Sequence, residues 1–221
     1  MTELTAVLFD FGGVITTSPF ENFAAYEQAS GLPKDLIRTI NSTNPDSNAW
    51  AQLERSAVSR DEFCALFEAE GAALGHEVSG AAVLDCLRTE LRPFMVNALG
   101  KIHAKYATAM LTNNFVSHAD QEAERGVKKS EQISSGASFA DIAHHFDHVI
   151  ESAVVGVRKP DPEIYRMACE AMGKAAEEVV FLDDLGINLK PARDMGMTTI
   201  KVVDGHDGLA ALSELLELDL T

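Results

Sequence analysis

The chain has 221 residues, with 34 acidic side chains against 18 basic ones and a formal net charge of −16. Its composition, 46% hydrophobic and 24% charged, is typical of a compact soluble protein and excludes collagen-like, low-complexity and largely disordered classes. The excess of acidic residues argues against nucleic acid and against an anionic membrane as partners, because both bind basic surfaces.

The N-terminus and the cysteines indicate a cytoplasmic protein. The first residues, MTEL, lack the basic-then-apolar order of a signal peptide. No apolar run approaches the length of about 20 residues that crosses a bilayer. The three cysteines are widely spaced and form no C-x-x-C pair, which suits a reducing compartment: Cys64, Cys86 and Cys169.

Short apolar runs alternate with helical spacing through most of the chain. The first run, 4–9 (LTAVLF), ends at Asp10 and is followed by two glycines, which is typical of a buried strand entering a turn. Further runs of this kind stand at 107–111, 148–150, 179–182 and 198–202. Helical spacing occurs at 94–104, 162–172, 189–195 and 209–218. This alternation predicts an α/β fold with a Rossmann-like parallel sheet covered by helices.

One long segment, 17–92, has helical spacing and no clear strand. Helices are expected there at 20–29, 35–40, 49–53, 63–67 and 83–87. We interpret the segment as a helical domain inserted into a core domain that consists of residues 1–16 and 93–221. A second irregular region, 117–138, is polar and is expected to be a long loop with some helix.

Polar residues follow the ends of the predicted strands. In an open parallel sheet, ligands bind beyond the carboxyl ends of the strands, so these residues are candidates for a site. Each alone would be read as a turn, cap or solvated side chain, but together they recur at consecutive strand ends. In chain order they are Asp10, Thr112, Asn113, Asn114, Lys159, Asp183 and Asp184.

These residues lie in four motifs through which the sequence resembles the haloacid dehalogenase (HAD) superfamily of aspartate-nucleophile hydrolases. The motifs read VLFDFGGV at 7–14, LTN at 111–113, GVRKPDP at 156–162 and VFLDDLGIN at 180–188. Residues 146–203 look closest to the N-terminal phosphatase domain of soluble epoxide hydrolases, and the glycines after Asp10 look more like those of sugar-phosphate phosphatases. The resemblance implies a HAD core with a helical cap in the type-1 position.

The resemblance also implies an activity, that of a phosphatase acting on a small phosphorylated metabolite. Asp10 would be the nucleophile, because a carboxylate can attack phosphorus and split one difficult displacement into two easier ones through an aspartyl-phosphate. The phosphate would be bound by Thr112, Asn113 and Lys159, with Lys159 supplying a point charge and the other two neutral donors.

A Mg²⁺ ion is the cofactor that the resemblance implies, because an anion attacking an anion needs charge neutralisation by a hard cation. Its ligands would be Asp10, Asp184 and the backbone carbonyl of Gly12. Asp183 would support them. Asn188, from the following helix, would orient the carboxylates, although a polar residue near a helix start is an equally good interpretation of it.

The motif departs from the family at Gly12. HAD phosphatases usually carry an Asp two residues after the nucleophile, as general acid and then base, and such help contributes about 10²–10⁴-fold to the rate. Three interpretations stay open: esters with activated leaving groups such as sugar 1-phosphates or acyl phosphates, a proton supplied by a cap residue, or a site that binds phosphate or a partner with little turnover. A 2-haloacid dehalogenase-like hydrolase is a fourth, ranked lower because we do not expect its metal-free site to keep Asp183 and Asp184 together.

Overall fold

The computed structural model describes residues 3–114 and 139–220. The loop expected at 117–138 lies outside the described residues. In the described part of the chain, no helix has both the length and the apolar character of a membrane span.

Five parallel strands form one sheet in the order β3-β2-β1-β4-β5. The strands are β1 Ala6–Phe9, β2 Ala107–Thr112, β3 His148–Glu151, β4 Val179–Asp183 and β5 Thr198–Lys201. The register pairs Phe9, the last residue of β1, with Met110 on one side and with Leu182 on the other, so β2 and β4 run on past the end of β1 to Thr112 and Asp183. All residues of β1 and β4 are buried, as expected for a parallel sheet with both faces covered. The predicted α/β fold is confirmed.

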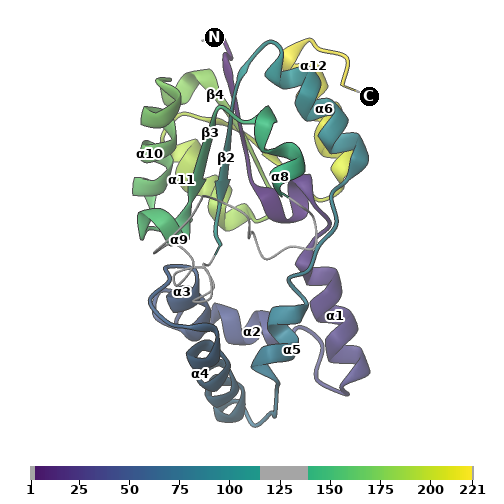
Figure 1. Cartoon of the computed structure of the whole chain (residues 1–221), viewed down its shortest axis with the longest axis vertical. Helices are drawn as coiled ribbons and strands as arrows, with labels where there is room; N and C mark the ends of the chain where they lie inside the picture. Colours follow the sequence, from purple (N-terminus) through teal and green to yellow (C-terminus); the bar gives the residue numbers. More distant parts are fainter. Residues whose placement is uncertain (1–2, 115–138, 221) are drawn as a thin grey trace.

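Helices cover both faces of this sheet (Figure 1). One face carries α6 Pro93–His103, α8 Phe139–Ile142 and α12 Gly205–Leu216, and the other carries α9 Ser152–Val155, α10 Pro162–Met172 and α11 Gly186–Asp194. Short single turns occur at η1 Phe11–Ile15, η2 Ala143–His145 and η3 Ala176–Glu178. Each face of the sheet has its own cluster of buried apolar side chains, so the sheet lies between two separate layers of the core.

The segment between β1 and α6 lies beyond the carboxyl ends of the strands (Figure 1). It contains α1 Pro19–Ala29, α2 Leu36–Ser42, α3 Ala49–Leu53, α4 Arg60–Ala73 and α5 Gly80–Asp85. These helices enclose a third apolar cluster, in which the Trp50 ring meets Phe23 and Phe63 edge to face, with ring centroids 6.0 and 5.6 Å away. The helical layer therefore has an apolar core of its own.

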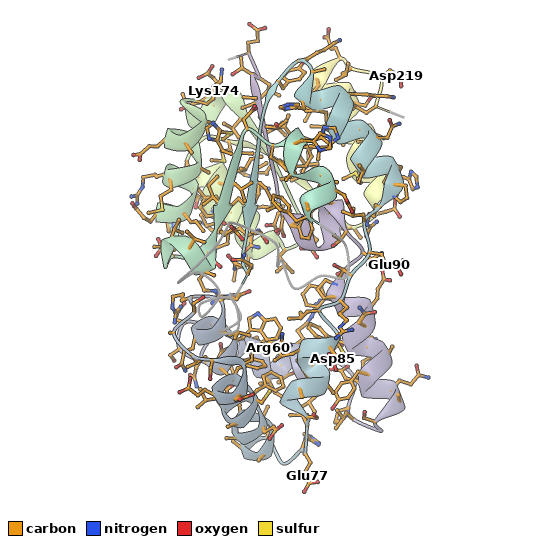
Figure 2. The ribbon with its side chains drawn as sticks, in the orientation of Figure 1. Arg60, Glu77, Asp85, Glu90, Lys174 and Asp219 are labelled. Atoms are coloured by element: carbon orange, nitrogen blue, oxygen red, sulfur yellow. The ribbon has the colours of Figure 1, made fainter. Side chains whose placement is uncertain are left out.

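The chain crosses between the two layers at one pair of adjacent segments. Thr16 and Leu91 form an antiparallel bridge, and the backbone N–H of Thr17 donates to the carbonyl of Glu90 at 2.8 Å. The Arg92 side chain donates through Nε to the Thr16 carbonyl at 2.9 Å. Figure 2 shows Glu90 at this junction, between the sheet layer and the helical layer. The crossing ties the entry and exit of the inserted helices together.

The predicted domain boundaries fall at this crossing. We refer to residues 17–92 as the cap and to residues 1–16 with 93–221 as the core. That these two parts are independent domains stays a prediction, which the separate apolar cluster of the cap supports.

Candidate active site

The loop after β1 places Asp10 at the carboxyl end of the sheet. Asp10 is 7% exposed, and its Oδ1 accepts a hydrogen bond from the backbone N–H of Phe11 at 2.7 Å. Gly13 has φ +77°, and a Cβ at this position would lie 2.3 Å from Oδ2 of Asp184, so the loop needs glycine here. Gly12 differs: its φ is −67°, and a Cβ there would meet nothing within 4 Å. The structure therefore has room for a side chain at position 12.

Lys159 lies between two of the carboxylates. Its Nζ is 2.8 Å from Oδ1 of Asp10 and 2.8 Å from Oδ2 of Asp183, and the residue is 1% exposed. Burial alone would lower the pKa of Lys159, but the two carboxylates outweigh it and raise the pKa above its usual value. Lys159 is therefore a buried, permanently charged ammonium.

Asn113 holds the backbone of Lys159 with both ends of its side-chain amide. The Lys159 N–H donates to Oδ1 of Asn113 at 2.8 Å, and Nδ2 of Asn113 donates to the Lys159 carbonyl at 3.0 Å. Thr112, the last residue of β2, is buried, and its hydroxyl donates to the Asn113 carbonyl at 3.5 Å. Asn114 turns the other way, since its backbone N–H donates to Oγ of Ser152 at 3.0 Å. The structure thus brings Asn113 to Lys159 and uses Asn114 to anchor the loop.

Asp183 is the most enclosed carboxylate of the site, at 0% exposure. Besides Lys159, its donors are the backbone N–H of Leu185 at 2.8 Å and Nδ2 of Asn188, which lies 3.1 Å from each carboxylate oxygen. The carbonyl of Asn188 accepts a hydrogen bond from the Tyr165 hydroxyl at 2.7 Å, so α10 supports the start of α11. Asp183 is therefore held in one orientation from β4, from α11 and from the loop between α9 and α10 that carries Lys159, here called the Lys159 loop.

Three carboxylates form one cluster: Asp10, Asp183 and Asp184 each offer an oxygen, and these lie within 4.8 Å of one another. Burial, with help from the other two carboxylates, raises the pKa of Asp10 well above its usual value against the opposing charge of Lys159. Burial and Asp183 raise the pKa of Asp184 to about 6, opposed by Lys159 and by Arg38 of the cap. When all three carboxylates are ionised, their negative charge exceeds the single positive charge of Lys159. An all-oxygen donor set with excess negative charge fits a hard divalent cation such as Mg²⁺.

A residue that sequence reasoning missed, Glu54, reaches this site from the cap. It follows α3 and is 9% exposed. Its Oε1 accepts a hydrogen bond from Nε1 of Trp50 at 3.0 Å. Its Oε2 lies 2.6 Å from Nε of Arg158, as an ion pair, and accepts from Nδ2 of Asn113 at 3.4 Å. No motif marks Glu54 in the sequence; a carboxylate directly after an apolar helical run that also holds the one tryptophan was the only available signal.

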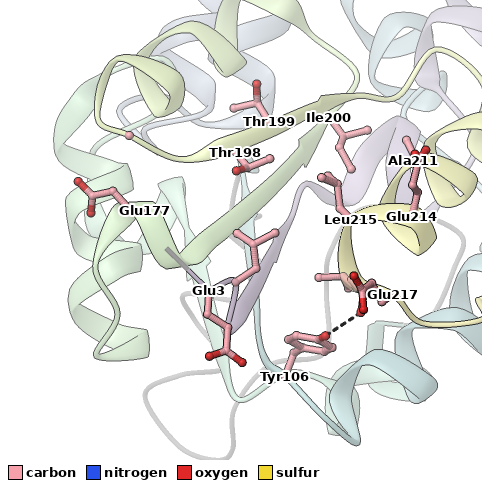
Figure 3. Close-up of a pocket in the computed structure, with 13 residues that line it drawn as sticks. Glu3, Tyr106, Glu177, Thr198, Thr199, Ile200, Ala211, Glu214, Leu215 and Glu217 are labelled. Atoms are coloured by element: carbon pink, nitrogen blue, oxygen red, sulfur yellow. Dashed lines mark hydrogen bonds between the residues drawn. The ribbon is translucent and has the colours of Figure 1, made fainter. Parts of the chain in front are cut away.

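A hollow at the opposite end of the sheet is separate from these residues (Figure 3). Tyr106 lies just before β2, Glu177 just before β4, and Thr198 begins β5, so this hollow opens at the amino ends of the strands. The Tyr106 hydroxyl donates to the carbonyl of Leu216 at 3.0 Å, marked by the dashed line. Open parallel sheets bind ligands at their carboxyl ends, so the candidate active site is the Asp10 cluster.

Comparisons with known sequences place the chain in a family. The haloacid dehalogenase-like hydrolase family matches residues 4–196. The chain is 31% identical over 224 residues to bifunctional epoxide hydrolase 2 of Mus musculus, an alignment that covers 96% of the chain and 38% of that relative. It is 28% identical to a sesquiterpene phosphatase of Aspergillus oryzae, over 98% of the chain and 97% of the relative. The chain therefore spans little more than a third of the mouse protein and almost all of the fungal one.

A solved structure supports the same assignment at the level of the fold. It is that of a HAD family enzyme from Bacteroides thetaiotaomicron in complex with magnesium and inorganic phosphate. The TM-score is 0.56 at 21% sequence identity, and the match covers 90% of the chain and 93% of that enzyme. From the family match and the similarity to relatives along its whole length, the chain belongs to the haloacid dehalogenase-like hydrolases and is a hydrolase.

Proposed function

We propose that this hydrolase is a Mg²⁺-dependent phosphatase of a small, sugar phosphate-like metabolite, and that it works through an aspartyl-phosphate on Asp10. The observation that carries the proposal is the contact of one buried ammonium, Lys159, with two of three clustered carboxylates at the end of the central strand. A phosphatase among the relatives and a fold neighbour that holds magnesium and phosphate support it. A cytoplasmic location is part of the proposal, supported by three free cysteines.

The reaction would proceed in two displacements at phosphorus, the first by the Asp10 carboxylate and the second by water. An oxygen of Asp10 attacks phosphorus, the bond from phosphorus to the ester oxygen breaks, and the leaving group departs as an anion that takes its proton from water. Water then attacks the aspartyl-phosphate, which releases inorganic phosphate and restores the Asp10 carboxylate. Lys159, Thr112 and Asn113 would bind the phosphoryl oxygens, and the two hydrogen bonds between Asn113 and Lys159 set their geometry before the substrate arrives. Asn113 would donate through its backbone N–H, because both hydrogens of its side-chain amide are engaged by the Lys159 carbonyl and by Glu54.

A bound Mg²⁺ would supply neutralisation of the phosphoryl charge and would be held by Asp10, Asp184 and the Gly12 carbonyl. Asp183 would act in support, because its oxygens already accept from Lys159 and Asn188. In this role Asn188 orients Asp183, and Asp183 in turn orients Lys159.

The absence of a carboxylate at position 12 bears on the substrate. Without a general acid at Gly12, esters whose leaving groups need little protonation should react best, such as sugar 1-phosphates and acyl phosphates. Packing does not account for the missing carboxylate, because a Cβ at Gly12 would meet nothing within 4 Å.

The test is a phosphatase screen with Mg²⁺ that covers sugar 1-phosphates, sugar 6-phosphates, acyl phosphates and an aryl phosphate. Asp10→Asn is the control, since it keeps the size of the nucleophile and removes its charge. We expect turnover that needs both Asp10 and Mg²⁺ and that is fastest on the activated esters. Turnover that survives Asp10→Asn or a chelator would contradict the mechanism. Chloride release from 2-haloacids without phosphatase activity would identify a dehalogenase, and phosphate binding without any turnover would identify a binding protein.

A further inference from the structure

We propose that Glu54 is a positioning residue: from the cap, it holds Asn113 and the Lys159 loop in their anion-binding arrangement, so that phosphate binding depends on the cap being docked on the core. This inference rests on the proposed function, because it concerns the same anion site. It adds a residue outside the four motifs and links closure of the cap to the phosphate-binding groups.

The side chain of Glu54 is buried between the cap and the core. Glutamate is seldom this buried unless its charge is paired. Both carboxylate oxygens are engaged, Oε1 by the Trp50 indole and Oε2 by Arg158 and Asn113. Burial raises the pKa of Glu54, and the charge of Arg158 opposes this rise. A carboxylate occupied in this way is suited to fixing its partners in place.

Two partners of the Glu54 side chain, Arg158 and Asn113, adjoin Lys159. Arg158 precedes Lys159 in the chain, and Asn113 holds the Lys159 backbone through two hydrogen bonds. Arg158 also donates through a terminal guanidinium nitrogen to the carbonyl of Pro45 at 2.8 Å, so the cap contacts this arginine at two points. Glu54 is thus connected to the backbone of Lys159 in two ways, through Arg158, which precedes Lys159 in the chain, and through Asn113, which is hydrogen-bonded to it.

Glu54 contacts the core on the side opposite to the place where the chain passes between core and cap. In Figure 1, α3 lies beneath α9, whereas the chain passes between core and cap on the other side, next to α1. The Glu54 carbonyl accepts a hydrogen bond from Oγ of Ser152, the first residue of α9, at 2.7 Å. The chain itself joins core and cap next to Thr16 and Leu91, whereas the contacts of Glu54 with the core are non-covalent and need the cap to lie against the core.

The experiment compares Glu54→Ala and Glu54→Gln with Glu77→Ala, all with Mg²⁺ present. Glu77→Ala is the matched control, because it removes the same charge from an exposed glutamate at the end of the cap that lies farthest from the core (Figure 2). The readouts are the inhibition constant of inorganic phosphate, kcat and KM for esters whose leaving groups differ in pKa, and the melting temperature.

We expect Glu54→Ala to weaken phosphate binding and to lower kcat/KM by about 10- to 100-fold, the range for hydrogen bonds to charged groups. The loss should be the same for every leaving group. Glu54→Gln keeps a hydrogen-bonding side chain and should recover part of this loss. Glu77→Ala should stay within about threefold of the unmodified protein, because a surface substitution away from the site changes little.

Two outcomes would overturn the inference. Unchanged phosphate affinity in Glu54→Ala would mean that Glu54 does not position the anion site. A loss that grows with the leaving-group pKa, together with loss of one limb of the pH profile, would make Glu54 a proton donor instead. Failure of the proposed function is distinguishable from both, because the unmodified protein would then hydrolyse no ester while its affinity for phosphate could still be compared with that of the variants.

Discussion

Lys159 and Asp183 are joined by a fully buried ion pair of 2.8 Å, and the same ammonium is 2.8 Å from Asp10. A buried charge without a partner is costly, so these groups stabilise the fold only as a set. The arrangement has consequences for stability as well as for binding.

Removal of the ammonium should destabilise the protein in a chelating buffer. Lys159→Met leaves Asp10 and Asp183 buried without a counter-charge, and we expect the free energy of unfolding at neutral pH to fall by about 3–5 kcal/mol. Urea denaturation measures this, with Lys190→Met as the control, because Lys190 is an exposed lysine whose ion-pair partner in the described part of the chain is Asp194. Equal stability of the two variants would show that the buried ion pairs do not hold the site together.

Introduction of a carboxylate at position 12 should change the substrate preference. Gly12→Asp fits the open space there and a backbone φ of −67° that any residue can adopt. We expect a gain of about tenfold or more in kcat/KM for esters with poor leaving groups and little change for activated ones, because general acid help matters most for poor leaving groups.

The control for this gain is Gly12→Asn, which has the same size and no acidic proton. Steady-state kinetics on an alkyl phosphate and an aryl phosphate separate the effect of side-chain size from the effect of the acidic proton. If Gly12→Asp and Gly12→Asn improve both esters alike, the missing acid does not explain the substrate preference.

A side chain at the neighbouring position, Gly13, should disturb the site, whereas one at Gly12 should fit. A Cβ in Gly13→Ala would fall 2.3 Å from Oδ2 of Asp184, and its φ of +77° is unfavourable for alanine. We expect displacement of Asp184, weaker Mg²⁺ binding by calorimetry, and a loss of stability of about 1–2 kcal/mol. Gly12→Ala should bind Mg²⁺ normally, and Gly13→Ala binding equally well would contradict this account.

The stability of the metal-free protein should depend on pH through Asp184. Burial raises its pKa from 3.8 to about 6. A carboxyl group whose pKa rises on folding stabilises the fold fully below its unfolded pKa, and this contribution is lost as the pH rises through the folded pKa. Between pH 4 and pH 7 in chelator, we expect the Asp184 contribution to the free energy of unfolding to fall by about 2–3 kcal/mol.

Asp184→Asn should lack this part of the pH dependence, which chemical denaturation at several pH values would detect. Addition of Mg²⁺ should reverse the slope for the unmodified protein, because a cation binds the ionised carboxylate. A variant with the same slope as the unmodified protein would assign the pH dependence to other groups.

Much of the fold and part of the site could be predicted from the sequence, because they depend on local patterns. The helix at Pro162–Met172 begins and ends where the sequence predicts, since Asp161 caps its first turn and Gly173 follows it with a left-handed φ of +62°. The strands differ from the predicted runs by a residue or two at their ends, where pairing with the neighbouring strand decides the last residue.

The position of Asp10 and of the Asp183-Asp184 pair at one edge of the sheet follows from the sequence alone. Strands that alternate with helices pair in parallel, and parallel strands bring their carboxyl ends to the same edge. The residues just after the apolar runs are therefore expected at that edge, and the strand order, with β1 between β2 and β4, brings Asp10 next to the Asp183-Asp184 pair.

Only the tertiary structure decided the position of Glu54 and the difference between Gly12 and Gly13. Glu54 meets Asn113 across 59 positions of sequence, and that contact depends on how the cap docks rather than on any local pattern. The two glycines look alike in the sequence, yet one has open space beside it and the other faces Asp184. Local patterns specify which elements form and which edge of the sheet carries the polar residues, whereas contacts between distant segments specify which atoms meet there.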